Sequence, residues 1–506
     1  MTTGAEPRDV MQGPGEGRGV RLSRRQFIAR AAALGAGGSA MAAFLAACGA
    51  SATATAVAPT ARAAATQAAT AVPAGAGATV ASAATQVASA VPGAAATVGA
   101  AGTQVAGARP AGSPAAAAGP VRLTDNKLVL AVMNDQSGVY ADLSGKNATQ
   151  AVRMAVEDFQ AKYGQNALGG PIEVIDADHQ NKPEVANTRA QEFYDRNQVD
   201  VIFDVPTSSC ALAVAGVAKE KRKLHLNVSA ATTELTGAQC NKYTFHWAYD
   251  TWMLANGTAA YVTKNIGKKW YILYPNYAFG QDMDRSFQDA IKKNGGEISA
   301  SDPTPWPATG DFSSFLLKAP SLRPDVLGAM QAGGDLVNLV KQYNEFKLRD
   351  QRIRLAIGLL FDTDIKALGP DAFQGVVYTT PWIWSMDDEA RQWADKYKQK
   401  TGSRPTFAHS GNYSAAWQYL EAVRRAGTDD ADAVVAALEN YEFSDVFARN
   451  AKVRAEDHLV VHDVLLAEVK KASDVKEDFD YATVLSKVPA AEAFRPLSEA
   501  APLCKK

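Results

Sequence analysis

The sequence predicts an α/β protein made of two lobes, each with a parallel sheet. From Lys127 onward, short β-rich segments alternate with amphipathic helical segments. Strands and helices that alternate in this way form parallel sheets with helices on both faces. The 386 residues from 121 to 506 are too many for one such sheet, so two lobes are the economical arrangement.

The strands and helices can be placed from periodicity and turn residues. In the first helix, Gly145 to Lys162, apolar residues such as Val152 and Phe159 recur at helical spacing. The predicted strands are Lys127 to Met133, Ile172 to Asp176, Val199 to Asp204, Lys223 to Val228, Lys269 to Tyr274, Asp325 to Met330, Arg352 to Ile357 and Gly375 to Thr379. The further helices are Pro183 to Arg196, Cys210 to Lys219, Met253 to Lys264, Gly280 to Asn294, Asp335 to Phe346, Asp387 to Lys400 and Tyr413 to Ala426.

The charge balance excludes a basic polyanion binder, so no nucleic acid partner is expected. The chain has 52 Lys and Arg against 53 Asp and Glu. Residues 1 to 120 hold eight of the basic and three of the acidic residues, which leaves 44 against 50 in residues 121 to 506. The part expected to fold is therefore mildly acidic.

The first 47 residues have the features of an export signal. Arg21 to Ile28 reads Arg-Leu-Ser-Arg-Arg-Gln-Phe-Ile and precedes a short apolar stretch rich in glycine. This segment resembles a twin-arginine signal peptide, and the stretch is too short for a comfortable membrane span. Leu45-Ala46-Ala47-Cys48 then resembles a bacterial lipobox. The resemblance implies a lipid on Cys48 that anchors the protein to the membrane, with residues 1–47 removed; an incidental cysteine is the alternative.

Residues 48–120 are predicted to form a disordered tether. From residue 49 to 120 there are 32 Ala in 72 positions and two charged residues, Arg62 and Arg109. Such a composition buries too little apolar surface to offset the entropy of ordering. Thr-Gln pairs recur in it at spacings of 19 and 18 residues, which indicates a duplicated short unit. A linker without a selected length fits nearly as well.

Three loops after predicted strands combine small residues, hydroxyls and backbone amides near a helix start. They contain Ser137-Gly138, Thr207-Ser208-Ser209 and Ser229-Ala230-Ala231-Thr232. Ligands in open α/β sheets bind beyond the carboxyl ends of the strands, where helix starts favour anions. Helix capping explains any one of these loops equally well. Three of them in one lobe favour a carboxylate site.

Together these loops resemble the branched-chain amino-acid type of ABC transporter substrate-binding proteins. Two further motifs contribute to the resemblance, which covers about residues 125 to 470 in order: Tyr277-Ala278-Phe279-Gly280 and Ala332-Gly333-Gly334-Asp335. It implies the type I periplasmic-binding fold, with two Rossmann-like lobes joined by three hinge crossovers and a ligand between them. The first lobe would comprise 121–247 plus 383–445 and the second 248–382 plus 446–506, with Phe245 to Asp250 as one crossing.

The resemblance also implies the ligand-binding residues. Thr207 and Ser208 would meet the ligand carboxylate, with further contacts from the third loop. Tyr140 would border the pocket, and residues of the second lobe would close over the ligand. The complete predicted set is Ser137, Tyr140, Thr207, Ser208, Ser229, Ala230, Ala231, Thr232, Tyr277, Phe279, Asp335 and Phe361.

Two positions depart from the amino-acid binders of this family. The residues expected to read the ligand ammonium correspond to Ala231 and Leu360. A buried ammonium without a charged partner is costly, which disfavours an ordinary α-amino acid unless Thr232, Asp335 or Asp362 compensates. Otherwise nearby aromatic residues favour a carboxylate with an apolar or aromatic body: Phe279, Phe361, Trp382 and Trp384. Core packing is the plainer explanation of these rings.

Enzyme signatures are absent from the sequence of the folded region. It has no Gly-x-Ser-x-Gly elbow and no phosphate-binding loop, and no cofactor is predicted. His458 and His462 have a metal-ligand spacing for a helix, but the segment around them reads as a strand. With Cys48 lipidated, three cysteines remain, so one disulfide at most forms. Cys210 and Cys240 are the pair nearest in sequence, and unpaired thiols are the alternative.

The sequence therefore predicts a non-enzymatic, extracytoplasmic receptor held at the membrane through Cys48. It would bind a small carboxylate between its lobes and deliver it to the permease and ATPase subunits of an ABC importer. The alternative functions are a ligand-sensing subunit of a signalling system with the same lobes and an extracellular hydrolase that uses the same fold.

Overall fold

The computed structural model describes residues 120–506. The predicted signal peptide, Cys48 and nearly all of the predicted tether lie outside the described residues. Within residues 120–506, none of the helices is both long and apolar enough to span a membrane.

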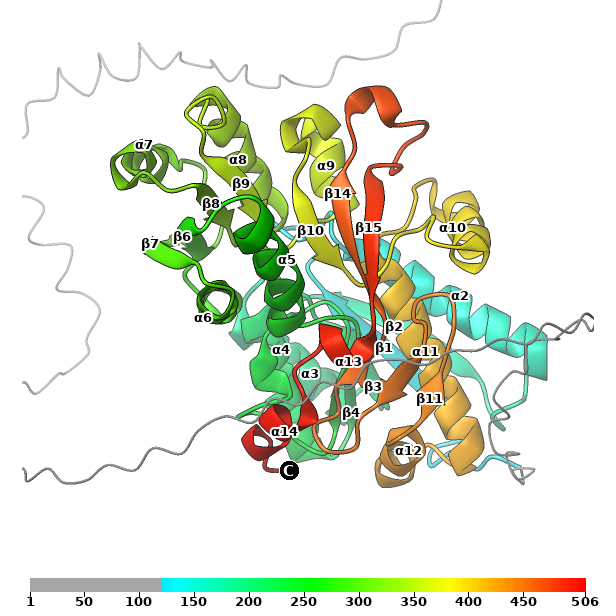
Figure 1. The fold of residues 1–506 in the computed structure, drawn as a ribbon. Coiled ribbons are helices and arrows are strands. Elements are labelled where there is room, and N and C mark those ends of the chain that lie inside the picture. The colour runs from blue at the N-terminus through cyan, green and yellow to red at the C-terminus, as the bar shows by residue number, and fades with distance from the viewer. Residues whose placement is uncertain (1–119) are drawn as a thin grey trace, which may run out of the picture. The chain divides into compact units, whose positions relative to one another are not determined.

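The first sheet is parallel and has the strand order β2-β1-β3-β4-β5 (Figure 1). Its strands are β1 (Leu128–Asn134), β2 (Ile172–Asp178), β3 (Val201–Asp204), β4 (Leu224–Asn227) and β5 (Thr244–His246). The connecting helices are α2 (Gly145–Tyr163), α3 (Pro183–Asp195) and α4 (Ser208–Lys221). Every residue of β1 is buried, as expected for a parallel strand covered on both faces.

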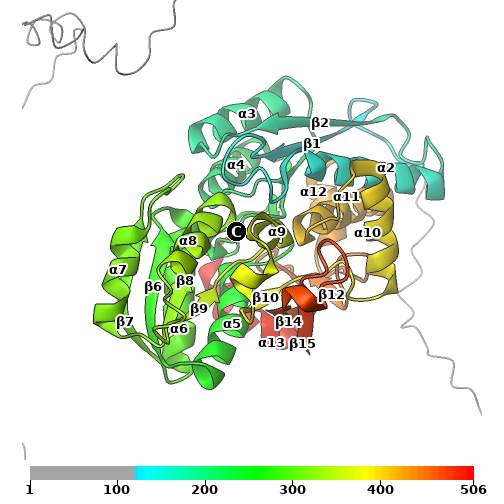
Figure 2. The same cartoon turned by 90° about the horizontal axis from the view of Figure 1, so that it is seen from above.

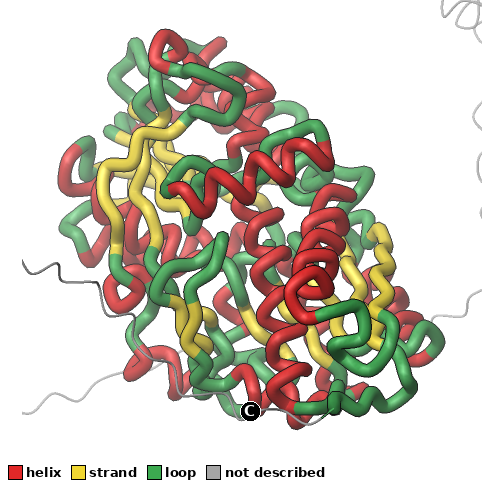
Figure 3. Tube along the Cα trace, turned by 90° about the vertical axis from the view of Figure 1, so that its right-hand side faces the viewer, coloured by secondary structure: helices red, strands yellow, loops and turns green. Residues whose placement is uncertain are grey.

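The second sheet is also parallel, with the order β7-β6-β8-β9. Its strands are β6 (Lys269–Pro275), β7 (Glu297–Thr304), β8 (Val326–Ala329) and β9 (Arg354–Ile357). Its helices are α5 (Thr251–Asn265), α6 (Ala278–Lys293), α7 (Ser313–Leu322), α8 (Gly333–Glu345) and α9 (Asp362–Leu368). Figure 3 shows the strands of the protein flanked by helices, as the alternation in the sequence predicts.

After β9 the chain returns to both parts of the structure. Strand β10 (Val377–Thr380) pairs antiparallel with β14 (Val464–Val469), which pairs with β15 (Ala482–Val488). Between them, α10 (Asp388–Thr401), α11 (Phe407–Ala426) and α12 (Ala431–Leu438) lead to a small sheet of β11 (Glu442–Phe443), β12 (Ala451–Val453) and β13 (Val460–Val461). Helix α11 packs on α2, whereas β10 packs on α5. Figure 2 shows α10, α11 and α12 near α2, and β10 near α5.

The chain crosses between the two parts three times, at 247–250, 381–387 and 462–463. The last crossing comes after β13, because β12 and β13 pair with β11 and Leu459 bridges to His246 of β5. We retain the division into two lobes as a proposal and place its third crossing at 462–463, whereas the sequence suggested residue 445. We call the part that contains β1–β5 the first lobe and the part that contains β6–β10 the second lobe.

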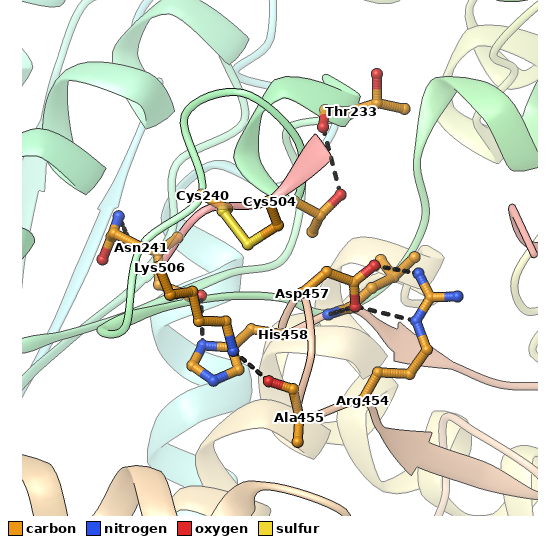
Figure 4. Close-up of a disulfide and its surroundings, with 12 residues drawn as sticks. Thr233, Cys240, Asn241, Arg454, Ala455, Asp457, His458, Cys504 and Lys506 are labelled. Atoms are coloured by element: carbon orange, nitrogen blue, oxygen red, sulfur yellow. Dashed lines mark hydrogen bonds and ion pairs between the residues drawn. A yellow bond between two sulfur atoms is a disulfide. The ribbon is translucent and has the colours of Figure 1, made fainter. Parts of the chain in front are cut away.

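The C-terminal segment returns to the first lobe, where Cys504 forms a disulfide with Cys240 (Figure 4). The pairing of Cys210 with Cys240, considered from the sequence, is therefore wrong. Cys210 is buried in α4 and unpaired within the described part of the chain. Nearness in sequence misled here because the tail after β15, with the short helices α13 (Ala490–Ala493) and α14 (Leu497–Ala500), runs back to the loop that holds Cys240.

Candidate functional site

A small cavity lies between the loops at the carboxyl ends of the two parallel sheets. It has about 10 Å³ of free space, enough for about one water molecule, and is lined by side chains from both lobes. This is the place where open α/β sheets bind ligands. The lining residues are Tyr140, Leu143, Pro206, Ser229, Ala231, Tyr249, Tyr277, Phe279, Ala332, Leu359 and Phe361.

The loop after β1 is held by Asp135, which positions Tyr140 at the cavity. The buried Asp135 carboxylate accepts the backbone N–H groups of Gly138 at 2.7 Å and Tyr140 at 2.8 Å. A Cβ on Gly138 would lie 2.6 Å from the Asn181 amide nitrogen, so this close approach favours glycine. The hydroxyl of Ser137 donates to Asp178 at 2.6 Å instead of lining the cavity.

The connection from β3 to α4 has an unusual backbone. Asp204 and Val205 both have positive φ, at 78° and 56°, which non-glycine residues rarely adopt. Strain of this kind gathers at functional sites. Pro206, the next residue, lines the cavity, and α4 begins two residues later at Ser208.

Thr207 and Ser208 are fully buried at the start of α4, outside the set of lining residues. The Thr207 hydroxyl donates to the side-chain oxygen of Asn181. The Ser208 hydroxyl has no hydrogen-bond partner within residues 120–506. The first turn of a helix also leaves backbone N–H groups without intrahelical partners. Donors for an anion are thus concentrated beside Pro206.

Asp204 ties three loops of the first lobe together. Its carboxylate accepts from the side chains of Asn134, at 3.1 Å, and Ser229. Burial raises the pKa of Asp204 above its ordinary value. The carboxyl ends of β1, β3 and β4 are therefore held together behind the cavity.

The loop after β4 contributes Ser229 and Ala231 to the cavity wall. The Ser229 carbonyl accepts the hydroxyl proton of Tyr249 at 2.5 Å. Ala230 lies outside the lining, and its carbonyl contacts the His246 ring at 2.7 Å. Thr232 is also outside the lining; it caps a short helical turn by accepting the Glu234 N–H at 3.3 Å.

The second lobe closes the cavity mainly with apolar and aromatic side chains. Tyr277 and Phe279 come from the start of α6, and Phe361 lies just before α9. The Phe361 ring stacks on Phe407 with centroids 4.3 Å apart. Tyr277 reaches across to the first lobe, where its hydroxyl lies 2.6 Å from that of Tyr140.

The cavity is uncharged: no Asp, Glu, Lys, Arg or His lines it in the described structure. Of the two positions expected to lack an ammonium reader, Ala231 lines the wall and Leu360 is buried between two lining residues. Trp382 and Trp384, considered from the sequence as aromatic neighbours, donate instead to the carbonyls of Val446 and Phe479, outside the lining.

Asp335 lies behind the cavity, in the first turn of α8 and three residues after the lining residue Ala332. Its side chain is buried, and neither carboxylate oxygen has a hydrogen-bond partner in the described region. Burial raises its pKa to about 7. The carboxyl group is therefore partly protonated near neutral pH.

Five lining residues lie outside the predicted set: Leu143, Pro206, Tyr249, Ala332 and Leu359. Pro206 directly precedes one predicted motif, and Ala332 is the first residue of another, in which only Asp335 was expected to contact the ligand. Tyr249 belongs to the segment predicted only as a hinge crossing. Leu143 gave no signal, because a leucine before a helix is typical core.

The two histidines with metal-ligand spacing make other contacts. His458 reaches Glu439 at 2.8 Å, and His462 contacts the Ala248 carbonyl at 2.9 Å. Among residues 120–506, no three His, Cys, Asp or Glu side chains are grouped so as to hold a metal ion.

Comparison with known proteins identifies relatives over the folded region. A family model for periplasmic binding proteins matches residues 127–474. A crystal structure of a periplasmic binding protein from Burkholderia mallei is 39% identical and has a TM-score of 0.71, with 75% of this chain and all of the other covered. A branched-chain amino acid ABC transporter periplasmic ligand-binding protein from Burkholderia xenovorans is 35% identical, with a TM-score of 0.66 and coverages of 74% and 98%.

Among curated proteins, Leu/Ile/Val-binding protein homolog 4 of Brucella melitensis is 24% identical over 381 residues. The match covers 71% of this chain and 88% of the relative.

Proposed function

The chain belongs to the periplasmic binding protein family, and we propose that it is the receptor of an ABC importer for a small aromatic or apolar carboxylate. Members of this family bind solutes outside the cytoplasm and are not enzymes. The fold is the α/β architecture of type I periplasmic binding proteins. The ligand class and the permease are the new parts of this proposal.

The uncharged cavity between the two lobes is the observation that carries the proposal. Its lining includes the aromatic rings of Tyr140, Tyr249, Tyr277, Phe279 and Phe361. Aromatic rings bury large apolar areas and pack well against a flat apolar ligand. An aromatic or branched apolar body fits such a wall.

The carboxylate of the ligand is assigned to the first lobe, at the start of α4. Backbone amides of a first helical turn and the partner-free Ser208 hydroxyl are donors that suit an anion. An α-ammonium, by contrast, would need an acceptor or a negative charge in the wall. Asp335 is the nearest candidate along the chain, but it lies behind the lining and is half neutral near pH 7.

We further propose the membrane attachment that the N-terminal sequence suggests. The twin-arginine segment would export the folded protein, and a lipid on Cys48 would anchor it. The tether of residues 48–120 would then leave the receptor free to reach its permease. A single acyl chain binds membranes only marginally, so the diacylglyceryl group is what makes the anchor durable.

A thermal-shift screen of the purified chain tests the ligand class. The panel contains leucine and valine, aliphatic acids, aromatic acids and the corresponding aromatic amides. A ligand at about 100 times its Kd adds about 2.7 kcal/mol to the free energy of unfolding, which is a clear shift in Tm. We expect aromatic acids to raise Tm, and their amides and the two amino acids to leave it unchanged.

Two results would contradict the proposal. A shift with leucine or valine alone would show that an ammonium is accommodated after all. A shift with no member of the panel would argue against a small-carboxylate importer and favour the sensory alternative. Uptake of a radiolabelled aromatic acid by cells with and without the gene then tests the transport role.

A further inference from the structure

Asn181 joins two of the loops that form the ligand site of the first lobe. It lies in the short connection between β2 and α3, outside the lining of the cavity, and is buried at 7% exposure. Its side-chain nitrogen donates to the Asp135 carboxylate, which also holds the N–H of Tyr140. Its side-chain oxygen accepts the hydroxyl proton of Thr207, the residue before α4. Asn181 thus connects the Tyr140 loop to the start of α4.

The orientation of the Asn181 amide is fixed by its two partners. A carboxylate offers only acceptors, and that of Asp135 also accepts three backbone N–H groups of its own loop, at 2.7 to 3.2 Å. Asn181 must therefore present its NH₂ group to Asp135. Its oxygen is then the group that faces Thr207.

The hydroxyl proton of Thr207 is used by this contact. A hydroxyl has one proton, and here the proton goes to Asn181, so only the lone pairs of the Thr207 oxygen remain available. Lone pairs repel a carboxylate. The neighbouring Ser208 hydroxyl has no partner among residues 120–506 and keeps its proton free. Of these two hydroxyls, only that of Ser208 can donate to a ligand while Thr207 is bound to Asn181.

The backbone at Asn181 is fixed as well. Its φ is 56°, a left-handed conformation that asparagine tolerates better than most residues. Its N–H donates to the His179 ring at 3.0 Å, and the His179 N–H donates to the Asn134 carbonyl of β1 at 3.0 Å. The side chain of Asn181 therefore extends from a turn that is held against the sheet.

We propose that Asn181 is a positioning residue of the ligand site, and that Thr207 acts through it instead of contacting the ligand. Donors that are already in place bind a ligand more tightly, because less freedom is lost on binding. Without the Asn181 side chain, the start of α4 loses its link to the Tyr140 loop, and its donors are placed less precisely. The inference rests on the proposed function, since it assumes that a carboxylate binds at the start of α4.

Calorimetric titration of the wild type and Asn181→Gly with benzoate, phenylacetate and 4-methylpentanoate tests this role. Glycine adopts a positive φ freely, so the variant removes the side chain and leaves the turn intact. We expect affinity for each acid that the wild type binds to fall about tenfold, the value of one hydrogen bond. The matched control is Asn440→Gly, an exposed asparagine with a φ of 58° outside the cavity lining, which should leave affinity unchanged.

A double-mutant cycle with Thr207→Val distinguishes positioning from a purely structural role. Thr207→Val alone should lower affinity, but it should lower it by less than about twofold further in Asn181→Gly, because both changes break the same link. Thr207→Ser keeps the hydroxyl and should bind like the wild type. Independent losses that add in the double variant would show that Thr207 contacts the ligand itself, and this would overturn the inference.

The remaining results separate this inference from the proposed function. If the wild type gives no heat with any of the three acids, the proposed function fails, and the inference fails with it. If the wild type binds an acid and Asn181→Gly binds it equally well, only the inference is wrong, even if the variant has a lower Tm. Circular dichroism shows whether each variant is folded at the temperature of the titration. Asn181→Asp replaces an unfolded Asn181→Gly, because aspartate tolerates the same φ but cannot donate to Asp135; it should show the same loss.

Discussion

The two sides of the junction between the lobes are built differently. On the cleft side, the lobes meet through aromatic rings and the Tyr140–Tyr277 hydroxyl pair. Behind that wall, the Ser208 hydroxyl and both oxygens of Asp335 have no hydrogen-bond partner in the described structure. The cleft side therefore has buried polar groups without hydrogen-bond partners, and a ligand can supply these partners.

The other side, near the crossings between the lobes, is called the hinge side here. Its contacts include charged groups with hydrogen-bond partners and a disulfide. Asp282 of α6 accepts from the Thr233 N–H of the first lobe at 2.7 Å and from the hydroxyl of Thr251, the residue after the first crossing, at 2.6 Å. The disulfide of Cys240 and Cys504 closes the same side. In Figure 4, the adjacent Arg454 and Asp457 form an ion pair.

The difference shows how one fold can combine a hinge with one stable arrangement and a cleft whose arrangement depends on the ligand. Buried polar groups with complete hydrogen bonds stabilise a single arrangement. Buried polar groups without partners lower the stability of the folded protein, and a ligand that forms hydrogen bonds with them binds more tightly. Substitutions on the hinge side should therefore lower the free energy of unfolding, whereas substitutions on the cleft side should change ligand binding without lowering it.

The largest loss of stability is expected from removal of the disulfide. Cys240→Ser with Cys504→Ser should lower the free energy of unfolding by about 2–5 kcal/mol, because the bond spans 264 residues and constrains the unfolded chain. Urea unfolding of the oxidised wild type and the double variant measures this difference. Equal midpoints would show that the C-terminal segment contributes nothing to stability.

Asp335→Asn should instead raise stability, and only above acidic pH. The folded-state pKa of Asp335 is raised to about 7 from an ordinary value of 3.8. Folding thus loses stability as pH rises from about 4 to 7, because the unfolded carboxyl ionises first, and the loss is complete above pH 7. The variant has no carboxyl group at this position and does not lose this stability. Its free energy of unfolding should therefore exceed that of the wild type by on the order of 2–4 kcal/mol at pH 8.

Urea unfolding of the wild type and Asp335→Asn at pH 4.5, 6 and 8 measures the effect. An advantage that is the same at all three pH values would contradict the assignment of a raised pKa to Asp335. The comparison with the variant separates this group from Asp362 and Asp364, whose pKa values burial also raises to about 7.

Asp282→Asn should weaken the hinge by about 1.5–3 kcal/mol, the range for hydrogen bonds to a charged group. The control is Asp289→Asn, an exposed carboxylate on the same helix, which should change stability by less than about 0.5 kcal/mol. Denaturation of the two variants side by side measures the contrast. Equal losses of stability in the two variants would show that Asp282 stabilises the protein no more than an exposed carboxylate does.

The smallest change in stability is expected for Ser208→Ala. Its buried hydroxyl has no partner among residues 120–506, so its removal breaks no hydrogen bond and the free energy of unfolding should not fall. Affinity for an aromatic acid should nevertheless fall about three- to tenfold, the value of one hydrogen bond. Ser314→Ala, in the first turn of α7, is the control. Unchanged affinity in Ser208→Ala would remove this hydroxyl from the carboxylate site.

The regular elements could be predicted from sequence because burial on both faces gives parallel strands a continuous apolar run. The observed β1 (Leu128–Asn134) is shifted by one residue from its predicted bounds, and α3 (Pro183–Asp195) ends one residue earlier than predicted. Strand β7 was missed because Glu297–Thr304 is polar and partly exposed, without the apolar pattern of its neighbours. Strands β12 and β13 are only three and two residues long, too short to show a periodic pattern.

The candidate site was less predictable than the fold, since it depends on how loops from both lobes meet. The motif after β4 placed Ser229 and Ala231 in the wall but not Ala230, because alternate residues of an extended loop face opposite ways. Asp335 was expected to contact ligand, but it lies buried behind Ala332. The Cys240–Cys504 pairing required the path of the C-terminal tail, which no local pattern encodes.

The central claim is that a ligand draws the two lobes together at the cleft while the hinge side stays fixed. Spin labels at Lys146 of α2 and Lys341 of α8, both exposed, report the distance across the cleft by electron spin resonance. Saturation with an aromatic acid identified by the thermal-shift screen should shorten and narrow the distance distribution. An identical distribution with and without ligand, under conditions where the ligand raises Tm, would contradict the account.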